Sequence, residues 1–140
     1  MTTFATAATL LRGRFESDWV SGPGVPRTPI AWQNIPFTPG DDTPWVYFEV
    51  LHGDASQIGL GAAGARAFRQ TGVVLIHVFT PVAEGTDIIF GLADAAAAIL
   101  RGSDLSGVLC RAPRIQGTPD ADGEWYRLTV AVPFQYDELS

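Results

Sequence analysis

Residues 125–136 read WYRLTVAVPFQY, and this stretch decides the fold class. Large apolar side chains occupy every second position, namely Tyr126, Leu128, Val130, Val132, Phe134 and Tyr136. The positions between them are mixed: Trp125, Arg127, Thr129, Ala131 and Gln135. Because successive side chains of a β-strand point to opposite faces, a period of two predicts a strand with one face in the core. We expect this strand over residues 124–136.

Four further stretches are predicted to be strands. Residues 45–51 alternate with the same period, and residues 56–60 and 68–80 lie on either side of a glycine- and alanine-rich loop. The second half of the latter stretch is almost entirely apolar, which is typical of a central strand covered on both faces. Residues 108–115 precede a polar turn at residues 117–123, so we expect them to form a hairpin with the C-terminal strand.

Two helices are also predicted. The first, residues 4–19, has an apolar stripe at helical spacing formed by Phe4, Ala8, Leu11 and Phe15. The second, residues 84–101, has a stripe formed by Ile88, Leu92, Ala95, Ala96 and Ile99. Gly102 is well placed just after its C-terminus. The order of elements predicts one α+β domain over residues 1–140, with a mixed, mainly antiparallel β-sheet and two helices packed on one face.

Residues 21–42 are rich in proline and glycine, so an extended segment is expected there and a central strand is not. Within this segment, residues 30–35 are candidates for pairing at a sheet edge. The segment also contains large apolar side chains: Ile30, Trp32, Ile35 and Phe37. A free linker would not contain so many, and we therefore expect the segment to lie along the domain or along a neighbouring molecule.

Residues 53–70 are predicted to form a hairpin arm. Its tip, residues 59–65, consists of glycine, alanine and one leucine, and Arg66 and Arg69 lead out of it. Because glycine has no Cβ, such a tip permits positive φ and close approach of another chain. The arm is therefore expected to order against a partner. A mobile surface loop is the alternative interpretation.

The composition excludes several classes of protein. The chain has 140 residues and a net charge of -6, with nine arginines and no lysine. Affinity for nucleic-acid phosphates comes from clustered basic side chains, so this balance argues against a nucleic-acid binder. The single cysteine excludes an internal disulfide and a Cys-rich zinc site, and it fits synthesis in a reducing cytoplasm. We recognise neither a secretory signal nor a membrane span, and we expect a soluble protein.

The residues that most often perform catalysis lie in contexts that favour structural roles. His77 lies in an apolar strand and is expected to be a hydrogen-bonded structural histidine. His52 precedes residues 53–54, where a turn is expected. Cys110 is interpreted as a small buried hydrophobe and not as a nucleophile. No G-x-S-x-G motif surrounds any serine, so we predict that the protein is not an enzyme.

Two partial matches to binding motifs are rejected. Gly59-x-Gly61-x-x-Gly64 has the spacing of a dinucleotide-binding loop, but a predicted strand follows it where that motif requires a helix. Asp120 and Asp122 match part of an EF-hand calcium loop, but the flanking segments are predicted strands. We therefore predict no cofactor and no metal site.

A series of motifs resembles one known family. In chain order the motifs are WQNIPF (32–37), WVYFEV (45–50), QIGLG (57–61), RQTGVVLI (69–76), an alanine-rich helix and WYRLTVAVPF (125–134). Together they resemble the tail terminator-like proteins of siphophages, prophages and gene transfer agents, over about residues 4–137. Each motif is a pattern of apolar and aromatic residues without a catalytic signature.

The resemblance implies a structural virion protein, assembled in the host cytoplasm, whose mixed sheet has helices on one side. Tail terminators form a hexameric ring at the head-proximal end of the tail, where they stop polymerisation of the tail tube and join the head connector. The implied partners are other copies of the chain, the tail tube protein and the head–tail connector protein. Alternatives are another head–tail ring protein, such as a connector adaptor or tail tube subunit, and a small ligand-binding or enzymatic α+β domain.

Closure of such a ring requires one surface of a subunit to meet a different surface of its neighbour. We expect strand edges, the arm and the segment around Trp32 to supply these surfaces. The expected interface residues are Trp32, Phe37, Gln57, Leu60, Gly61, Gly64, Arg66 and Arg69. Six copies, each of charge -6, would carry -36. DNA in the lumen would then be repelled and would pass without specific binding.

Overall fold

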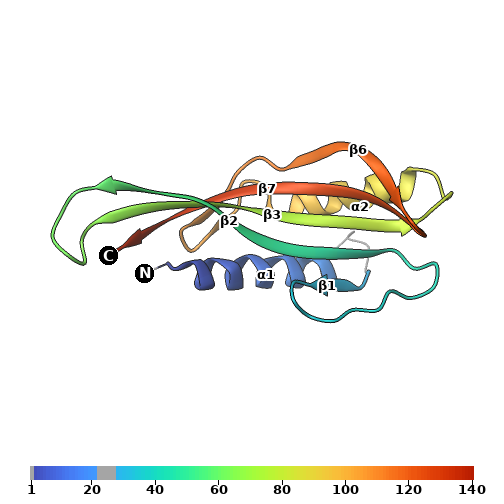
Figure 1. The fold of residues 1–140 in the computed structure, drawn as a ribbon, viewed down its shortest axis with the longest axis horizontal. Coiled ribbons are helices and arrows are strands. Elements are labelled where there is room, and N and C mark those ends of the chain that lie inside the picture. Colours follow the sequence, from blue (N-terminus) through green and yellow to red (C-terminus); the bar gives the residue numbers. More distant parts are fainter. Residues whose placement is uncertain (1, 22–27) are drawn as a thin grey trace.

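The computed structural model describes residues 2–21 and 28–140 (Figure 1). Within them the elements follow in the order α1 (Phe4–Ser21), β1 (Ile30–Trp32), β2 (Trp45–Gly59), β3 (Ala67–Pro81), α2 (Asp87–Leu100), β4 (Asp104–Leu105), β5 (Val108–Cys110), β6 (Arg114–Asp122) and β7 (Trp125–Leu139). The strands β2, β3 and β7 have 15 residues each. Because they run side by side along their length, the molecule is elongated (Figure 1).

The seven strands of the described residues form one sheet. Its order is β1-β2-β3-β7-β5-β4, and β6 also pairs with β7. The pair β1–β2 is parallel, and the other pairs are antiparallel. One edge of β7 pairs with β3 over its whole length, while the other pairs with β6 up to Ala131 and with β5 at Phe134 and Gln135. These observations confirm the predicted α+β class with a mixed, mainly antiparallel sheet.

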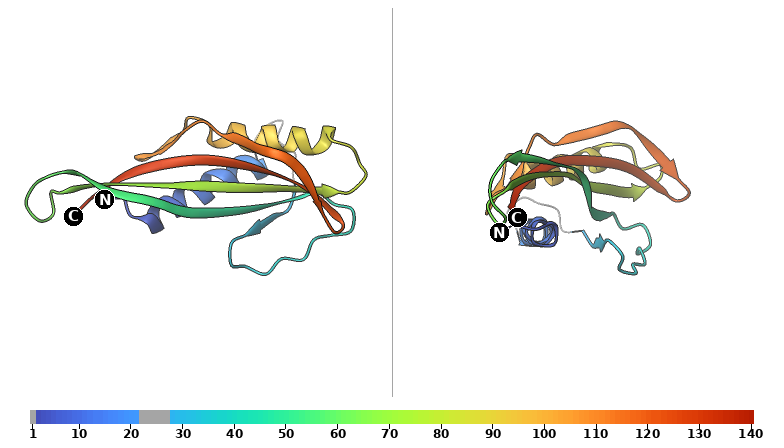
Figure 2. Two further views of the ribbon diagram at one scale, coloured as in Figure 1. Left: turned by 45° about the horizontal axis from the view of Figure 1, so that its top comes forward. Right: turned by 60° about the vertical axis from the view of Figure 1, so that its left-hand side comes forward.

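Both helices pack on the same face of the sheet, next to each other (Figure 2). The core lies between them and the buried faces of β2, β3 and β7. At its centre the Phe15 ring stacks on Trp19 and on Phe48, with ring centroids 5.3 Å and 5.0 Å apart. Removing such large apolar side chains from water is the main favourable term in folding. Neither helix is long and apolar enough to cross a membrane.

The buried stripes of the helices differ in part from those expected. The buried residues of α1 are Ala7, Leu11, Phe15 and Trp19, whereas Phe4 is 37% exposed. The buried residues of α2 are Ile89, Leu92, Ala93, Ala96, Ala97, Ile99 and Leu100. Placing Ile88 on the buried stripe was wrong, because Ile88, Ile89 and Phe90 are all apolar and spacing alone does not show which of them faces the core. Gly102 follows α2 at φ +63°, as predicted.

Two predictions about the long strands, one on a turn and one on burial, are wrong. The turn predicted at residues 53–54 is wrong, because β2 continues through it with a bulge between His52 and Ala55. The extra residue is absorbed without ending the ladder. The prediction that β3 is covered on both faces is also wrong. Val74, Ile76 and Val78 are fully buried, but the alternate residues are only partly buried, since both helices lie on one face.

The C-terminal hairpin is present, but its boundaries differ from the prediction. The stretch expected as one strand, residues 108–115, is divided into β5 and β6, and β4 was not expected. Pro113 lies between β5 and β6, where a missing backbone donor is tolerated. The turn predicted over residues 117–123 is shorter, because β6 extends to Asp122 and the turn occupies residues 123–124.

Of the glycines described, Gly72 leaves the least room for a side chain. A Cβ at this residue would lie 2.5 Å from the Leu51 carbonyl oxygen and 2.5 Å from Cζ of Phe134. Gly72 and Phe134 are also register partners, so the aromatic ring covers the glycine across the strand pair. Gly72 lies where the body of the sheet, which carries the helices, meets the part that projects beyond them.

Candidate functional site

The projecting part of the sheet is a three-stranded arm. It consists of residues 55–59 of β2, 67–71 of β3 and 135–139 of β7, with β3 in the middle. The arm extends past the N-terminal end of α1, so neither helix covers its end (Figure 1). Residues 51–58 are all exposed. The C-terminal strand therefore braces the hairpin that the sequence predicted, and the arm is stiffer than a two-stranded ribbon.

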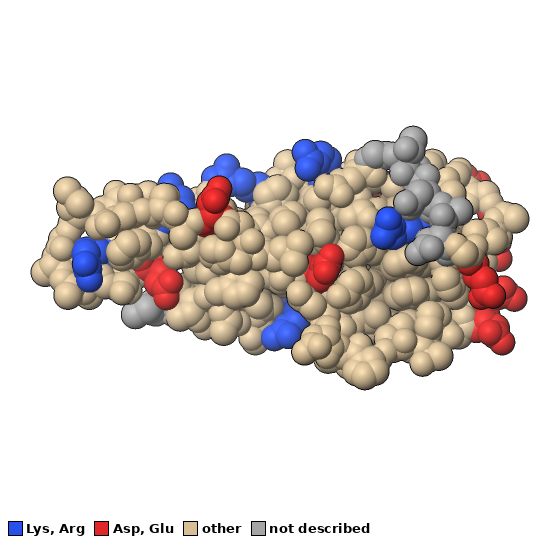
Figure 3. All heavy atoms as spheres, in the orientation of Figure 1, with Lys and Arg blue, Asp and Glu red and all other residues tan. Residues whose placement is uncertain are grey.

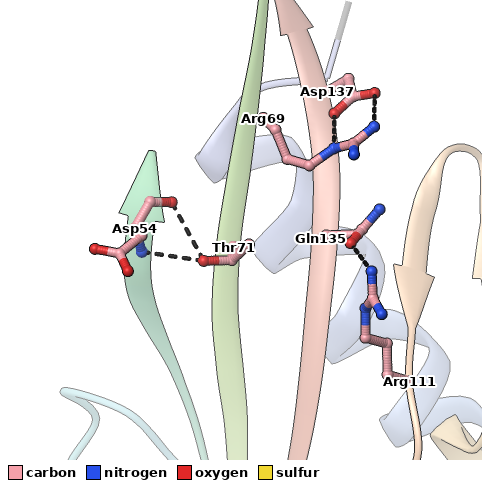
Figure 4. A network of polar contacts seen from close by, with 6 residues as sticks. All are labelled: Asp54, Arg69, Thr71, Arg111, Gln135 and Asp137. Atoms are coloured by element: carbon pink, nitrogen blue, oxygen red, sulfur yellow. Dashed lines mark hydrogen bonds and ion pairs between the residues drawn. The ribbon is translucent and has the colours of Figure 1, made fainter. Parts of the chain in front are cut away.

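Two arginines expected at the interface form hydrogen bonds within the arm. Arg69 pairs with Asp137 through two hydrogen bonds, Nε to Oδ1 at 2.9 Å and Nη2 to Oδ2 at 3.1 Å (Figure 4). Arg66 donates its backbone N–H and its Nε–H to the Ser140 carbonyl oxygen, both at 3.2 Å. These contacts join the start of β3 to the end of β7. Arg111, which contacts Gln135, extends the same polar row (Figure 4).

The bulge in β2 is closed by one side chain of β3. The Thr71 hydroxyl accepts a hydrogen bond from Asp54 N at 3.1 Å and donates one to Asp54 O at 3.3 Å (Figure 4). The backbone groups that the bulge leaves unpaired are therefore satisfied. Bulges increase the twist of a strand, so this contact helps to set the direction of the arm.

The Arg69–Asp137 pair makes the arm sensitive to acid. The hydrogen bonds from Arg69, and then its charge, lower the pKa of Asp137 below 3.8. A carboxyl whose pKa is lowered by folding stabilises the fold above its unfolded pKa and loses this effect as the pH falls through the folded value. We expect amide exchange of Arg69, relative to its intrinsic rate, to accelerate as the pH falls below 3.8 and through the lowered pKa of Asp137. Asp137→Asn should abolish this acceleration, and Asp54→Asn should retain it. An NMR titration that gives Asp137 a pKa of 3.8 or higher would contradict the assignment.

The tip of the arm exposes an apolar side chain. Leu60 is 94% exposed, and Gly64 has φ +88° in a turn closed by a 2.9 Å bond from Ala65 N to Ala62 O. Gln57, just before the tip, is exposed and donates to the Gly59 carbonyl at 3.2 Å. An isolated leucine on a loop of glycine and alanine is a slender apolar projection with little around it to shield it from water.

Trp32 and Phe37 lie away from the arm. Trp32 of β1 packs edge-on against Phe48 at 5.6 Å, at the margin of the core. Phe37 lies against Trp45, with ring centroids 5.1 Å apart. The structure therefore divides the expected interface residues into two groups. Six are on the arm or in the loop at its end, namely Gln57, Leu60, Gly61, Gly64, Arg66 and Arg69, while Trp32 is the last residue of β1 and Phe37 follows it.

Sequence reasoning missed the aromatic cluster on the face of the sheet opposite the helices. Trp45 stacks on Phe79 at 4.0 Å and meets Trp125 edge-on at 5.9 Å. Trp45 Nε1 is buried without a hydrogen-bond partner among the described residues. The signal was present, because all three residues occupy positions that alternate with core positions. Without the register of the strands, nothing in the sequence brings them together.

His77 connects three neighbouring strands through hydrogen bonds. Its Nε2 lies 2.9 Å from Glu49 Oε1, its Nδ1 lies 2.8 Å from Thr129 Oγ1, and its ring stacks on Tyr47. Burial, and then the charge of Glu49, raises the pKa of Tyr47. A row of carboxylate, imidazole and hydroxyl has the order of a catalytic triad. Tyr47 lines one of the described hollows, whereas Glu49, His77 and Thr129 line none of the five. The two hydrogen bonds of His77 join β2, β3 and β7, so His77 is a hydrogen-bonded residue of the sheet, as expected.

Cys110 is protected from reaction by the fold. It is 5% exposed, and burial, partly opposed by the Arg14 charge, raises its pKa from 9.0 to about 11. At pH 8 only about one thiol in 10³ is then ionised, and the thiolate is the reactive form. We expect an aromatic disulfide reagent to label native protein at least about 100-fold more slowly than protein in 8 M urea, because labelling requires opening of the core. Equal rates would show that Cys110 is accessible.

Acidic side chains gather at the end of the molecule opposite the arm (Figure 3). Asp41, Asp42 and Glu124 line a hollow of about 600 Å³ there. Among the described residues, no group of three or more histidine, cysteine or acidic side chains has the arrangement needed to hold a metal ion. The hollow therefore contributes to the negative charge at this end of the molecule.

Comparison with known proteins gives the family. Residues 7–134 match the family model described as phage tail terminator protein. A solved structure with 23% sequence identity shares the fold with a TM-score of 0.65, covering 92% of this chain and 94% of that chain. No curated protein matches the chain. Since the family match spans most of the chain, the protein is a structural component of a phage tail and belongs to the phage tail terminator family.

Proposed function

We propose that this chain forms a ring, the hexamer typical of tail terminators, at the head-proximal end of the tail. The ring stops polymerisation of the tail tube and joins the tail to the head connector protein. The observation that supports this most directly is the arm, which projects from the body and exposes Leu60 at its tip. A monomer gains nothing from such a projection, whereas a subunit can use it to reach a neighbour.

The solvent-exposed surface area of the chain supports a subunit that makes contacts with other proteins. The chain exposes 7648 Å², whereas a compact monomer of 15.0 kDa exposes roughly 7,000 Å². The sheet also has unpaired edges on opposite margins among the described residues. Beyond Phe48 no strand pairs with the outer edge of β2, and none pairs with the outer edge of β6. Two different edges allow the head-to-tail contact that a closed ring requires.

Charge supports the proposed passage of DNA. The net charge is -6 per subunit, and the end opposite the arm is acidic (Figure 3). A ring of such subunits repels DNA phosphates, so DNA passes through the lumen without being held. The partners proposed are further copies of the chain, the tail tube protein and the head–tail connector protein, in a virion assembled in the host cytoplasm.

Native mass spectrometry of the protein, alone and mixed with its tail tube protein, tests the ring directly. The subunit mass is 15.0 kDa, so a sixfold species of about 90 kDa is expected, either free or bound to the tube protein. Monomer in both samples at micromolar concentration would contradict the proposal.

A further inference from the structure

An open groove runs between α1 and residues 32–35. Its lining consists of Thr9, Arg12, Gly13, Glu16, Trp32 and Ile35, around a volume of about 350 Å³. A second hollow of about 400 Å³ shares Glu16 and Trp32 with it and extends toward Val20. Ile35 is 57% exposed and Val20 is 46% exposed. The groove therefore presents apolar side chains to water along one edge of α1.

Gly13 has no role in packing within the monomer. It lies in the middle of α1, where glycine weakens a helix relative to alanine. A Cβ at this position would meet nothing within 4 Å. Thr9, Gly13 and Glu16 follow helical spacing and face the same groove. The missing side chain leaves the groove open to close approach by another backbone.

The arm tip offers an apolar side chain to the apolar part of this groove. The tip is a loop of glycine and alanine with Leu60 as its one large side chain. Arg66 places a positive charge beside the tip, and Glu16, which has no ion-pair partner among the described residues, places a negative charge in the groove. The groove is also lined by Arg12, so the proposed contact requires Arg66 to approach on the side of Glu16. The tip of a molecule cannot reach its own groove, because it lies beyond the N-terminal end of α1, whereas β1 lies near the other end (Figure 1).

We propose that the arm tip of one copy docks in the α1–β1 groove of the next, with Leu60 over Gly13 and Arg66 facing Glu16. This inference rests on the proposed ring and names the two surfaces that form its subunit interface. The surfaces differ, so each copy offers a tip to one neighbour and a groove to the other.

Disulfide trapping tests this contact. The variant Leu60→Cys with Gly13→Cys is oxidised mildly, both as purified protein and after mixing with the tail tube protein. We expect a ladder of covalent species from dimer to hexamer on a non-reducing gel. The matched control, Leu60→Cys with Gly91→Cys, should give no ladder, because Gly91 is an equally open glycine in the middle of α2. Cys110 is buried and does not compete.

A charge exchange tests the pairing of Arg66 with Glu16. Glu16→Arg and Arg66→Glu should each weaken self-association at least about tenfold, because each brings like charges together. The double exchange should restore association to within about threefold of the wild type. Glu84→Arg, an exposed acidic residue outside the groove, should have little effect.

The two tests separate failure of this contact from failure of the ring. Assembled species without a ladder, or a double exchange that does not restore association, would overturn the docking of the arm and leave the ring intact. Absence of any assembled species, with or without the tube protein, would contradict the proposed ring and this contact together.

Discussion

Replacing residues 60–65 with Asn-Gly is expected to leave a folded protein that no longer assembles. The change removes Leu60 and shortens the loop, while Gln57 and Phe68 keep their pairing in the arm. Central apolar contacts of an interface each contribute about 2 kcal/mol or more, so losing the tip should raise the concentration needed for assembly by at least about 30-fold. Analytical ultracentrifugation of the variant and the wild type measures this directly.

The fold of this variant provides the control. Loop tips tolerate shortening when no buried backbone is affected, and residues 60–65 are exposed. The midpoint of thermal unfolding should therefore change by less than about 3 °C. Assembly at the wild-type concentration would show that the tip is not part of the interface. Loss of folding would show that the tip stabilises the monomer, and it would remove the main argument for the arm as a contact device.

Gly72→Ala is expected to destabilise the protein more than any other substitution that adds one methyl group to the sheet. The new Cβ would lie 2.5 Å from both the Leu51 carbonyl oxygen and the Phe134 ring, closer than real contacts allow. To relieve this clash, β2, β3 and β7 must move apart around Gly72. Overpacking of this kind lowers the free energy of unfolding by about 3 kcal/mol. Urea denaturation should show this loss, with a fall of roughly 10 °C in the unfolding temperature.

Gly91→Ala is the matched control for this prediction. A Cβ at Gly91 meets nothing within 4 Å, and the residue lies in the middle of α2. Alanine should therefore stabilise the helix by about 0.5 to 1 kcal/mol. If Gly72→Ala were as stable as the wild type, the close approach around Gly72 would not exist in solution.

Much of the fold follows from periodicity in the sequence. The alternation in residues 125–136 and the helical stripes require one buried face each, which specifies a sheet with helices on one side. Register is different, because it depends on contacts between strands far apart in the chain. The bulge at residues 53–54 was predicted as a turn since glycine and aspartate favour both. The prediction that β3 is covered on both faces failed for a similar reason. The partly exposed positions that alternate with its core positions are also mostly apolar, so the sequence does not distinguish the two faces.

The candidate site was predictable only in part. The run of glycine and alanine around Leu60 predicts an arm tip, whatever the register of the strands on either side. The internal pairing of Arg69 with Asp137 joins residues 68 positions apart, and no local pattern indicates it. The groove beside Gly13 depends on how residues 30–35 return along α1, which is a tertiary contact. For the same reason the aromatic cluster around Trp45 escaped prediction, although each of its residues was assigned to a strand.

The proposed function of this protein is to end the growth of the tail tube, so tails assembled without it should show the effect in their length. Electron micrographs of lysates from a phage lacking this gene should show tails longer than those of the wild type, with a broad spread of lengths and no joined heads. Supplying the gene in trans should restore one length. Tails of normal length in the absence of the protein would contradict the account, and normal tails that fail to join heads would identify it as an adaptor.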